Sequence, residues 1–182
     1  HISQQNLDLM PESLEEPKFE IIKKYNDFEI RKYFDTIQAQ VASPLSYEIS
    51  PSAHFREIAG YIFGNNSESQ NISMTAPVHT WEQNNQNIMA FTMPSKFNKD
   101  DLPKPNNKRV RIVDIEGENV AVLKFSWFAG KRRAKKFANK LQKLVENKGL
   151  KIKGNPKLAI YDNPMTTLPF MRRNEIHLPV EK

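Results

Sequence analysis

The sequence has no cysteine among its 182 residues, so disulfides, thiolate metal sites and a cysteine nucleophile are excluded. Its six glycines are too scattered to form a phosphate-binding loop, and G-x-S-x-G is absent. The four histidines include no pair spaced four residues apart, as a helical zinc site would need. These absences favour a protein that is not an enzyme.

Long apolar runs are missing as well. No run approaches the roughly 20 residues that cross a bilayer, and the N-terminus has neither a charged nor an apolar leader-like segment. We therefore expect a soluble chain without a membrane span. Because the chain begins at His1 rather than Met, a cytoplasmic protein and an exported protein that has lost a leader are both compatible with it.

The net charge of +6 is unevenly distributed. Residues 131–153 hold ten Lys or Arg against one Glu, whereas residues 8–20 hold five acids against one Lys. No aromatic or Gly-rich recognition pattern accompanies the basic segment, so we expect no nucleic-acid partner. The simplest interpretation is a solvated basic helix face; an acidic protein partner is the alternative. Lys131, Arg132 and Arg133 also stand in the first turn of a predicted helix, where a nearby carboxylate, phosphate or propionate would relieve their repulsion.

The length fits one domain. Residues 1–17 are polar and aperiodic, which predicts a loosely ordered N-terminal arm before a domain over 18–182. Strand patterns then cover 19–25 and 28–33, as one bulged strand or a hairpin. In residues 36–41, alternation predicts that Ile37, Ala39 and Val41 face the core and the glutamines face water.

The first predicted helix follows the caps of residues 50–52, and Gly64 ends it. Its apolar stripe consists of Phe55, Ile58, Ala59, Ile62 and Phe63. Two strands, 72–78 and 88–93, come next, joined by a turn rich in Asn and Gln.

The second half begins after a proline-containing connector near 101–107. Residues 110–115 and 120–128 predict a hairpin, and residues 131–148 a helix that Gly149 stops. Strands at 157–161 and 174–180 follow. The halves, about 18–100 and 108–182, share the order ββαββ, so we predict an internal repeat with eight antiparallel strands and two helices packed on the outside, an α+β fold.

Metal-ligating side chains are few. His54 lies off the apolar stripe of its helix, which predicts a solvated side chain, and His177 alternates with Ile176 and Leu178, which predicts a surface position beside Glu175. His79 follows the predicted strand 72–78 and is a weak ligand candidate, as is His54.

Methionines and a basic loop form a further candidate site. Five methionines lie close to the predicted strands and loops around the first helix: Met74, Met89, Met93, Met165 and Met171. The structural interpretation is that they fill the core; the functional one is that they form an adaptable apolar pocket or supply a soft haem ligand. Residues 170–173, Phe-Met-Arg-Arg, suit an apolar ligand with carboxylate tails, although the arginines could equally pair with nearby acids.

Four motifs in order resemble the SOUL haem-binding protein family. They are Ile-Ser-Met-Thr-Ala-Pro-Val at 72–78, Phe-Thr-Met-Pro at 91–94, the connector with Pro103 and Pro105, and Tyr-Asp-Asn-Pro at 161–164 followed by Arg-Arg-Asn-Glu-Ile at 172–176. The similarity covers about residues 18–180. It implies a distorted eight-stranded antiparallel barrel with two helices and an internal pseudo-two-fold.

The resemblance also implies a function: non-enzymatic binding of haem or another tetrapyrrole in a shallow groove beside the first helix, for buffering or transport. The groove residues it implies are Phe55, Ala59, Ile62, Phe63, Met165, Phe170, Met171 and Arg172. Ser52 and Gly60 stand where the family has basic contacts, and Lys32 where some members place an axial histidine, which makes Lys32 a third weak metal candidate. The alternative is an interaction module that binds no haem and uses the basic face of the second helix.

Overall fold

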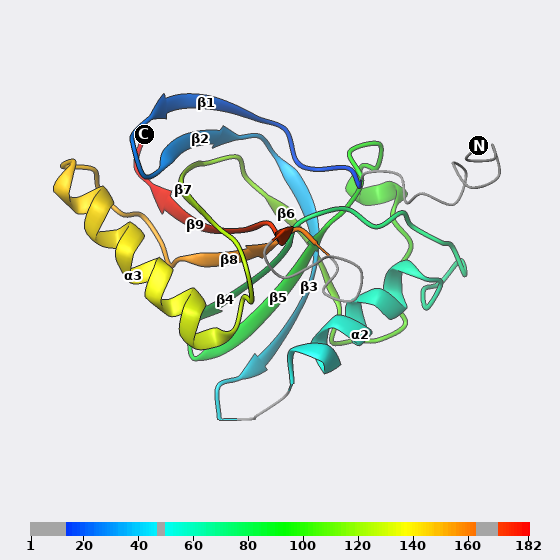
Figure 1. Ribbon diagram of the computed structural model, residues 1–182. Helices are drawn as coiled ribbons and strands as arrows, with labels where there is room; N and C mark the ends of the chain where they lie inside the picture. Colours follow the sequence, from blue (N-terminus) through cyan, green and yellow to red (C-terminus); the bar gives the residue numbers. More distant parts are fainter. Residues whose placement is uncertain (1–13, 47–49, 163–170) are drawn as a thin grey trace, which may run out of the picture.

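The computed structural model describes residues 14–46, 50–162 and 171–182, and within them one curled antiparallel sheet is flanked by two helices (Figure 1). The sheet order is β1-β2-β7-β9-β8-β4-β5-β3-β6. The sheet stays open, because β1 and β6 are its two edges. The α+β class is confirmed, but the described residues form nine strands, not eight. The strands are β1 (Phe19–Lys24), β2 (Glu29–Tyr33), β3 (Thr36–Pro44), β4 (Val78–Gln83), β5 (Gln86–Thr92), β6 (Arg111–Ile115), β7 (Asn119–Phe125), β8 (Lys157–Ile160) and β9 (Asn174–Val180).

The ninth strand comes from the start of the domain. Of the two alternatives for residues 19–33 the hairpin is correct, since β1 pairs antiparallel with β2, and a bulge lies between Ile21 and Lys23. Ahead of β1, residue 15 is already tied to the domain. The Glu15 carbonyl accepts the Ala76 N–H at 2.9 Å, and its carboxylate accepts the Ser95 N–H at 2.9 Å. The segment 1–13 of the predicted arm lies outside the described residues.

The predicted hairpin of residues 110–128 is wrong. β6 pairs with β3, whereas β7 pairs with β2 and β9. Periodicity located β6, and it located β7 except that β7 ends at Phe125 rather than at residue 128. It carries no information on which strand lies beside which. Between β6 and β7, Gly117 packs against the backbone of Tyr33 and Phe34 at the end of β2.

Gly117 is the position where that packing is tightest. A Cβ there would lie 2.5 Å from the Tyr33 carbonyl oxygen and 3.0 Å from the Phe34 backbone. We expect Gly117→Ala to lower the free energy of unfolding by about 1–3 kcal/mol, because backbone must move. Gly60→Ala is the matched control: its Cβ meets nothing within 4 Å, so it should be neutral or stabilising by up to about 1 kcal/mol. Urea unfolding compares the two variants, and equal stabilities would refute the close packing at Gly117.

A hairpin does form in the first half, but it starts later than predicted. Val78 is the first residue of β4, and residues 72–77 belong to no strand of the sheet, so the predicted strand 72–78 is wrong. A cis peptide bond joins Ala76 to Pro77 in this segment. The turn to β5 uses Asn84 and Asn85, both with positive φ, as two-residue hairpins prefer.

Helix α2 (Pro51–Ile62) packs on β3 and β5, and helix α3 (Lys131–Asn147) packs on β7 and β9. The predicted helix ends are confirmed: the Ser50 hydroxyl caps α2 at the Ala53 N–H, and Gly64 and Gly149 have positive φ. Each helix covers its own core cluster on the outer face of the sheet (Figure 1). Met89 and Met93 fill the cluster under α2, as the core interpretation of the methionines predicts, and Met74 packs against it.

Since the outer face carries the apolar cores, the alternate residues of each strand turn to the inner, concave face. Gln38 is 6 % exposed, so the prediction that the glutamines of this strand face water is wrong. Gln40 is half-buried and donates to the Gln38 side chain at 2.9 Å. The sheet curls over its polar face and removes it from water. Polar positions of the strands are therefore interior positions in this fold.

Candidate functional site: a buried polar network and an exposed aromatic helix

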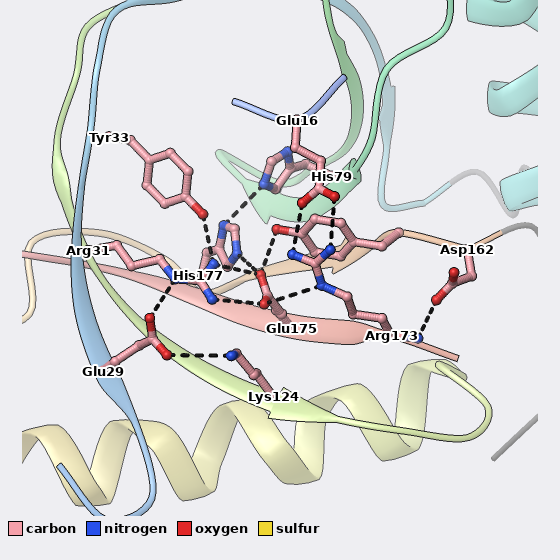
Figure 2. A network of polar contacts seen from close by, with 11 residues as sticks. Glu16, Glu29, Arg31, Tyr33, His79, Lys124, Asp162, Arg173, Glu175 and His177 are labelled. Atoms are coloured by element: carbon pink, nitrogen blue, oxygen red, sulfur yellow. Dashed lines mark hydrogen bonds and ion pairs between the residues drawn. The ribbon is translucent and has the colours of Figure 1, made fainter. Parts of the chain in front are cut away.

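Glu175 of β9 is the centre of a polar network on the concave face (Figure 2). Its side chain is fully buried, and Arg31 of β2 binds it with two parallel hydrogen bonds, Nη1–Oε1 at 2.9 Å and Nη2–Oε2 at 3.0 Å. The Tyr161 hydroxyl donates to Oε1 at 2.6 Å. The bidentate geometry and the additional donor are what a buried carboxylate needs in order to stay charged.

Arg31 is itself only 1 % exposed and has further acceptors. Its Nε donates to Glu29 at 3.0 Å, its Nη1 donates to the Tyr33 hydroxyl at 2.9 Å, and its guanidinium lies 4.2 Å from the Phe19 ring centre. Burial acts to lower the pKa of Arg31, but the hydrogen bonds and charge of Glu175 outweigh it, so the pKa is raised. Burial likewise acts to raise the pKa of Glu175, and its hydrogen bonds to His177 and Arg31 bring it well below the usual range. Both groups are charged at neutral pH.

Two histidines extend the network from Glu175. His177 Nε2 lies 2.9 Å from Glu175 Oε1, and His177 Nδ1 lies 3.2 Å from His79 Nε2. Burial is the main cause that lowers the pKa of both rings, so both are neutral at pH 7. A carboxylate only accepts hydrogen bonds, hence His177 carries its proton on Nε2 and accepts from His79 on Nδ1. The carboxylate thereby fixes the tautomers of both rings.

A second cation, Arg173, approaches Glu175 from the residue directly before β9. Arg173 Nε lies 3.9 Å from Glu175 Oε2, and Arg173 pairs with Glu16 at 2.8 Å. The guanidinium of Arg173 also stacks 3.7 Å from the Tyr161 ring centre. Of the two arginines of the Phe-Met-Arg-Arg segment, Arg173 therefore has a structural role, as the carboxylate-pairing alternative predicts.

A cavity of about 60 Å³ adjoins the network. Its lining includes Tyr33, Gln38, His79, Thr92 and His177. Ligand pockets for drug-sized molecules measure about 300–1,000 Å³, so this cavity does not hold a tetrapyrrole.

The histidines are where the sequence-based predictions fail most clearly. His177 is 5 % exposed rather than on the surface, and His54 is 4 % exposed rather than solvated. Alternation correctly separated His177 from Ile176 and Leu178, but the face it occupies is the inside of the curled sheet. Charge alone does not single out the buried pair: β2 also carries Glu29 and Lys32, and β9 also carries His177, so neither Arg31 nor Glu175 stands out in its strand.

The three weak metal candidates do not come together. His79 belongs to the buried network, His54 lies on α2, and the exposed Lys32 has its ammonium 5.7 Å from the Phe34 ring centre. Within residues 14–46, 50–162 and 171–182, no group of three His, Asp or Glu side chains is arranged to hold a metal ion.

The candidate groove residues divide by exposure. Phe55 is 38 % exposed and Phe63 64 %, whereas Ala59 is 7 % exposed and Ile62 only 1 %. Phe55 stands against Phe91 of β5, with ring centres 5.4 Å apart. Met171 is 62 % exposed, and Arg172 has its guanidinium 4.8 Å from the Phe128 ring centre. Met165 and Phe170 lie outside the described residues.

Fold and sequence together define the class of protein. A model of the SOUL heme-binding protein family matches residues 14–179, so the chain belongs to this family. No curated protein sequence matches the chain. No helix in the described part of the chain is both long and apolar enough to cross a membrane.

Solved structures share the fold at low sequence identity. The C-terminal domain of EcmrR is 14 % identical with a TM-score of 0.61, over 85 % of this chain and 97 % of that one. A hydrolase from Listeria innocua is 12 % identical with a TM-score of 0.56, over 88 % of this chain and 94 % of that one. At such identities the similarity concerns the fold alone.

Proposed function

We propose that the protein binds haem or a related tetrapyrrole reversibly on the outer surface of α2, without catalysis, and so buffers or transports it. The observation that carries the proposal is the exposed pair formed by Phe55 of α2 and Phe63, the residue directly after α2, in a chain of a heme-binding family. The interior cavity of about 60 Å³ is too small for such a ligand. A larger open hollow of about 460 Å³ lies beside Lys32 and Phe34, and the acidic side chains Asp35, Glu116 and Glu118 of its lining disfavour a ligand with carboxylate tails.

The geometry of α2 suits a flat ligand. Phe55, Ala59 and Phe63 recur every four residues, so they follow one another along one side of the helix, and the small Ala59 separates the two rings. Gly60 leaves open space above the backbone. A planar apolar ring system would cover both phenylalanines and remove them from water.

The charged edge of a tetrapyrrole needs cations. Ser52 and Gly60 supply none, but Arg56 is exposed on α2. We propose Arg56 and Arg172 as contacts for carboxylate tails and Met171 as an apolar contact. Met165 and Phe170, which the family resemblance adds to this site, lie outside the described residues. Apolar contact supplies most of the affinity, because no histidine of α2 is exposed.

Titration with hemin tests this function. We expect a Soret shift at micromolar hemin, and Phe55→Ser with Phe63→Ser should weaken binding about tenfold or more, because each ring contributes roughly 1 kcal/mol of apolar burial. Ile22→Ser is the matched control, since Ile22 is 52 % exposed but lies on the edge strand β1, and it should leave the affinity unchanged.

Two results would count against the proposal. Absence of any Soret shift at micromolar hemin would refute haem binding and favour the interaction module. Unchanged affinity in the double variant would place the site away from α2.

We also infer that the two halves are related as repeats. Four strands of the first half, β2 to β5, correspond in order to four of the second half, β6 to β9. If each strand is replaced by its counterpart, the order of these eight strands across the sheet is the original order read from the other edge, and β1 alone has no counterpart. α2 precedes β4 as α3 precedes β8, which supports the inference. The helices then occupy equivalent places with different surfaces, aromatic on α2 and basic on α3.

A further inference from the structure

Two exposed aromatic side chains lie where β7 leads into α3. Trp127 is 50 % exposed and Phe128 57 %, and the Arg172 guanidinium lies 4.8 Å from the Phe128 ring centre. We call Trp127 and Phe128 the aromatic tip. In Figure 1 the connection from β7 joins the lower end of α3.

The backbone of the aromatic tip is held in place. Trp127 has a φ of +75°, which a residue with a side chain adopts only under constraint. The buried Asn174 donates to the Trp127 carbonyl at 2.9 Å, and Arg133 donates to the Ser126 carbonyl at 3.1 Å. These contacts fix a loop conformation that leaves both rings outside the core, although each could be buried favourably.

A row of cations runs along α3 from the aromatic tip. Arg132, Lys136, Lys140 and Lys143 are exposed and spaced by four, four and three residues, so they form one stripe. The stripe lies opposite the buried Ala138, Leu141 and Val145, so it points away from the sheet. We call these four residues the basic stripe.

Nearby acids balance little of this charge. Lys131 lies 3.9 Å from Glu82, and the only acid of α3 is Glu146 in its last turn. The helix dipole adds positive potential at the end that carries the aromatic tip. The surface therefore combines exposed aromatic rings with an adjoining positive field.

We propose that the aromatic tip and the basic stripe together bind the surface of an anionic lipid bilayer. Trp and Phe insert favourably at the level of the lipid headgroups, and each Lys or Arg near an anionic membrane adds attraction. An acidic protein would complement the stripe, but it would have to supply a pocket for the protruding rings. A bilayer accepts them without one. This inference does not require haem binding on α2, although Arg172, proposed there as a carboxylate contact, stacks on Phe128 of the aromatic tip.

Binding to sucrose-loaded vesicles tests the proposal. The protein should sediment with phosphatidylcholine vesicles that contain about 30 % phosphatidylserine, hardly with phosphatidylcholine alone, and less as salt is raised. The triple variant Lys136→Gln, Lys140→Gln, Lys143→Gln should lose roughly a hundredfold in affinity, about fivefold for each charge. Lys96→Gln, Lys104→Gln, Lys108→Gln is the matched control, because these exposed lysines lie between β5 and β6, outside α3, and it should bind like the unchanged protein.

The tip is tested separately. Phe128→Ala should weaken vesicle binding severalfold, whereas Phe34→Ala, a comparably exposed ring beside Lys32, should not. Trp127 is exposed and Trp81 is buried, so the emission blue shift on adding anionic vesicles should disappear in Trp127→Phe.

Three outcomes would overturn the proposal. The first is no sedimentation with anionic vesicles. The second is binding that tolerates Phe128→Ala and produces no blue shift, which would leave only diffuse charge attraction. The third is equally tight binding to soluble polyglutamate, which would indicate an acidic protein partner instead.

Discussion

Arg31→Met should lower the free energy of unfolding by about 3–5 kcal/mol. The substitution removes both hydrogen bonds to Glu175 and leaves that carboxylate fully buried without its main counter-charge. Methionine has nearly the length of the apolar part of arginine, so little of the loss would come from packing. Urea unfolding at pH 7 measures it.

A double variant separates charge from shape. Adding Glu175→Gln to Arg31→Met removes the unpaired charge, so it should restore part of the lost stability, and the cycle of four proteins gives the coupling of the pair. Lys32→Met is the matched control: Lys32 is the exposed neighbour of Arg31 in β2, and its replacement should change stability by less than about 0.5 kcal/mol. Equal losses for Arg31→Met and Lys32→Met would contradict the buried pair.

The second large effect concerns acid. Three described histidines, His54, His79 and His177, are buried, and burial is the main cause that lowers the pKa of each. Below the ordinary histidine pKa of about 6.5 the unfolded chain takes up protons that the folded chain does not. Stability should therefore fall as the pH drops from 7 to 5, with a slope of up to about 1.4 kcal/mol per pH unit for each histidine.

Below pH 4.5 a second contribution begins. The pKa of Glu175 is lower in the folded than in the unfolded chain, so this residue contributes its full stabilisation above the unfolded pKa. As the pH falls below that value, the unfolded carboxyl is protonated first, and the stabilisation is lost. Urea unfolding at a series of pH values follows both phases. His54→Gln removes one contribution of the first phase without touching the network. A flat profile between pH 7 and 5 would show that the histidines are not buried as neutral groups.

The sequence allowed the class of fold, both helices and their ends, and the family to be predicted, because these depend on local signals. The 3.6-residue stripe of α3 and the glycines after both helices act within a few residues. The strand partners of β6 and β7 depend on contacts between distant segments, and local pattern does not determine them.

The buried network was missed for a related reason. A strand of alternating polar and apolar residues has the same sequence pattern whether its polar side faces water or the inside of a curled sheet. His177, Glu175 and Gln38 were assigned to the correct face, and the curvature that turns this face inward is a property of the whole sheet. The candidate groove residues on α2 rest on the family resemblance and await the hemin titration.

The bulged edge strand β1 has a consequence for self-association. The unpaired edge of an open sheet can pair with the edge of a second copy of the protein. Ile21 and Ile22 of β1 are 46 % and 52 % exposed, so a regular β1 would be an aggregation-prone edge. The bulge between Ile21 and Lys23 breaks the regular spacing of hydrogen-bonding groups along this strand, and Lys23 and Lys24 add like charges that repel an approaching copy. The irregular strand β1 thus disfavours edge-to-edge pairing at its own edge of the open sheet.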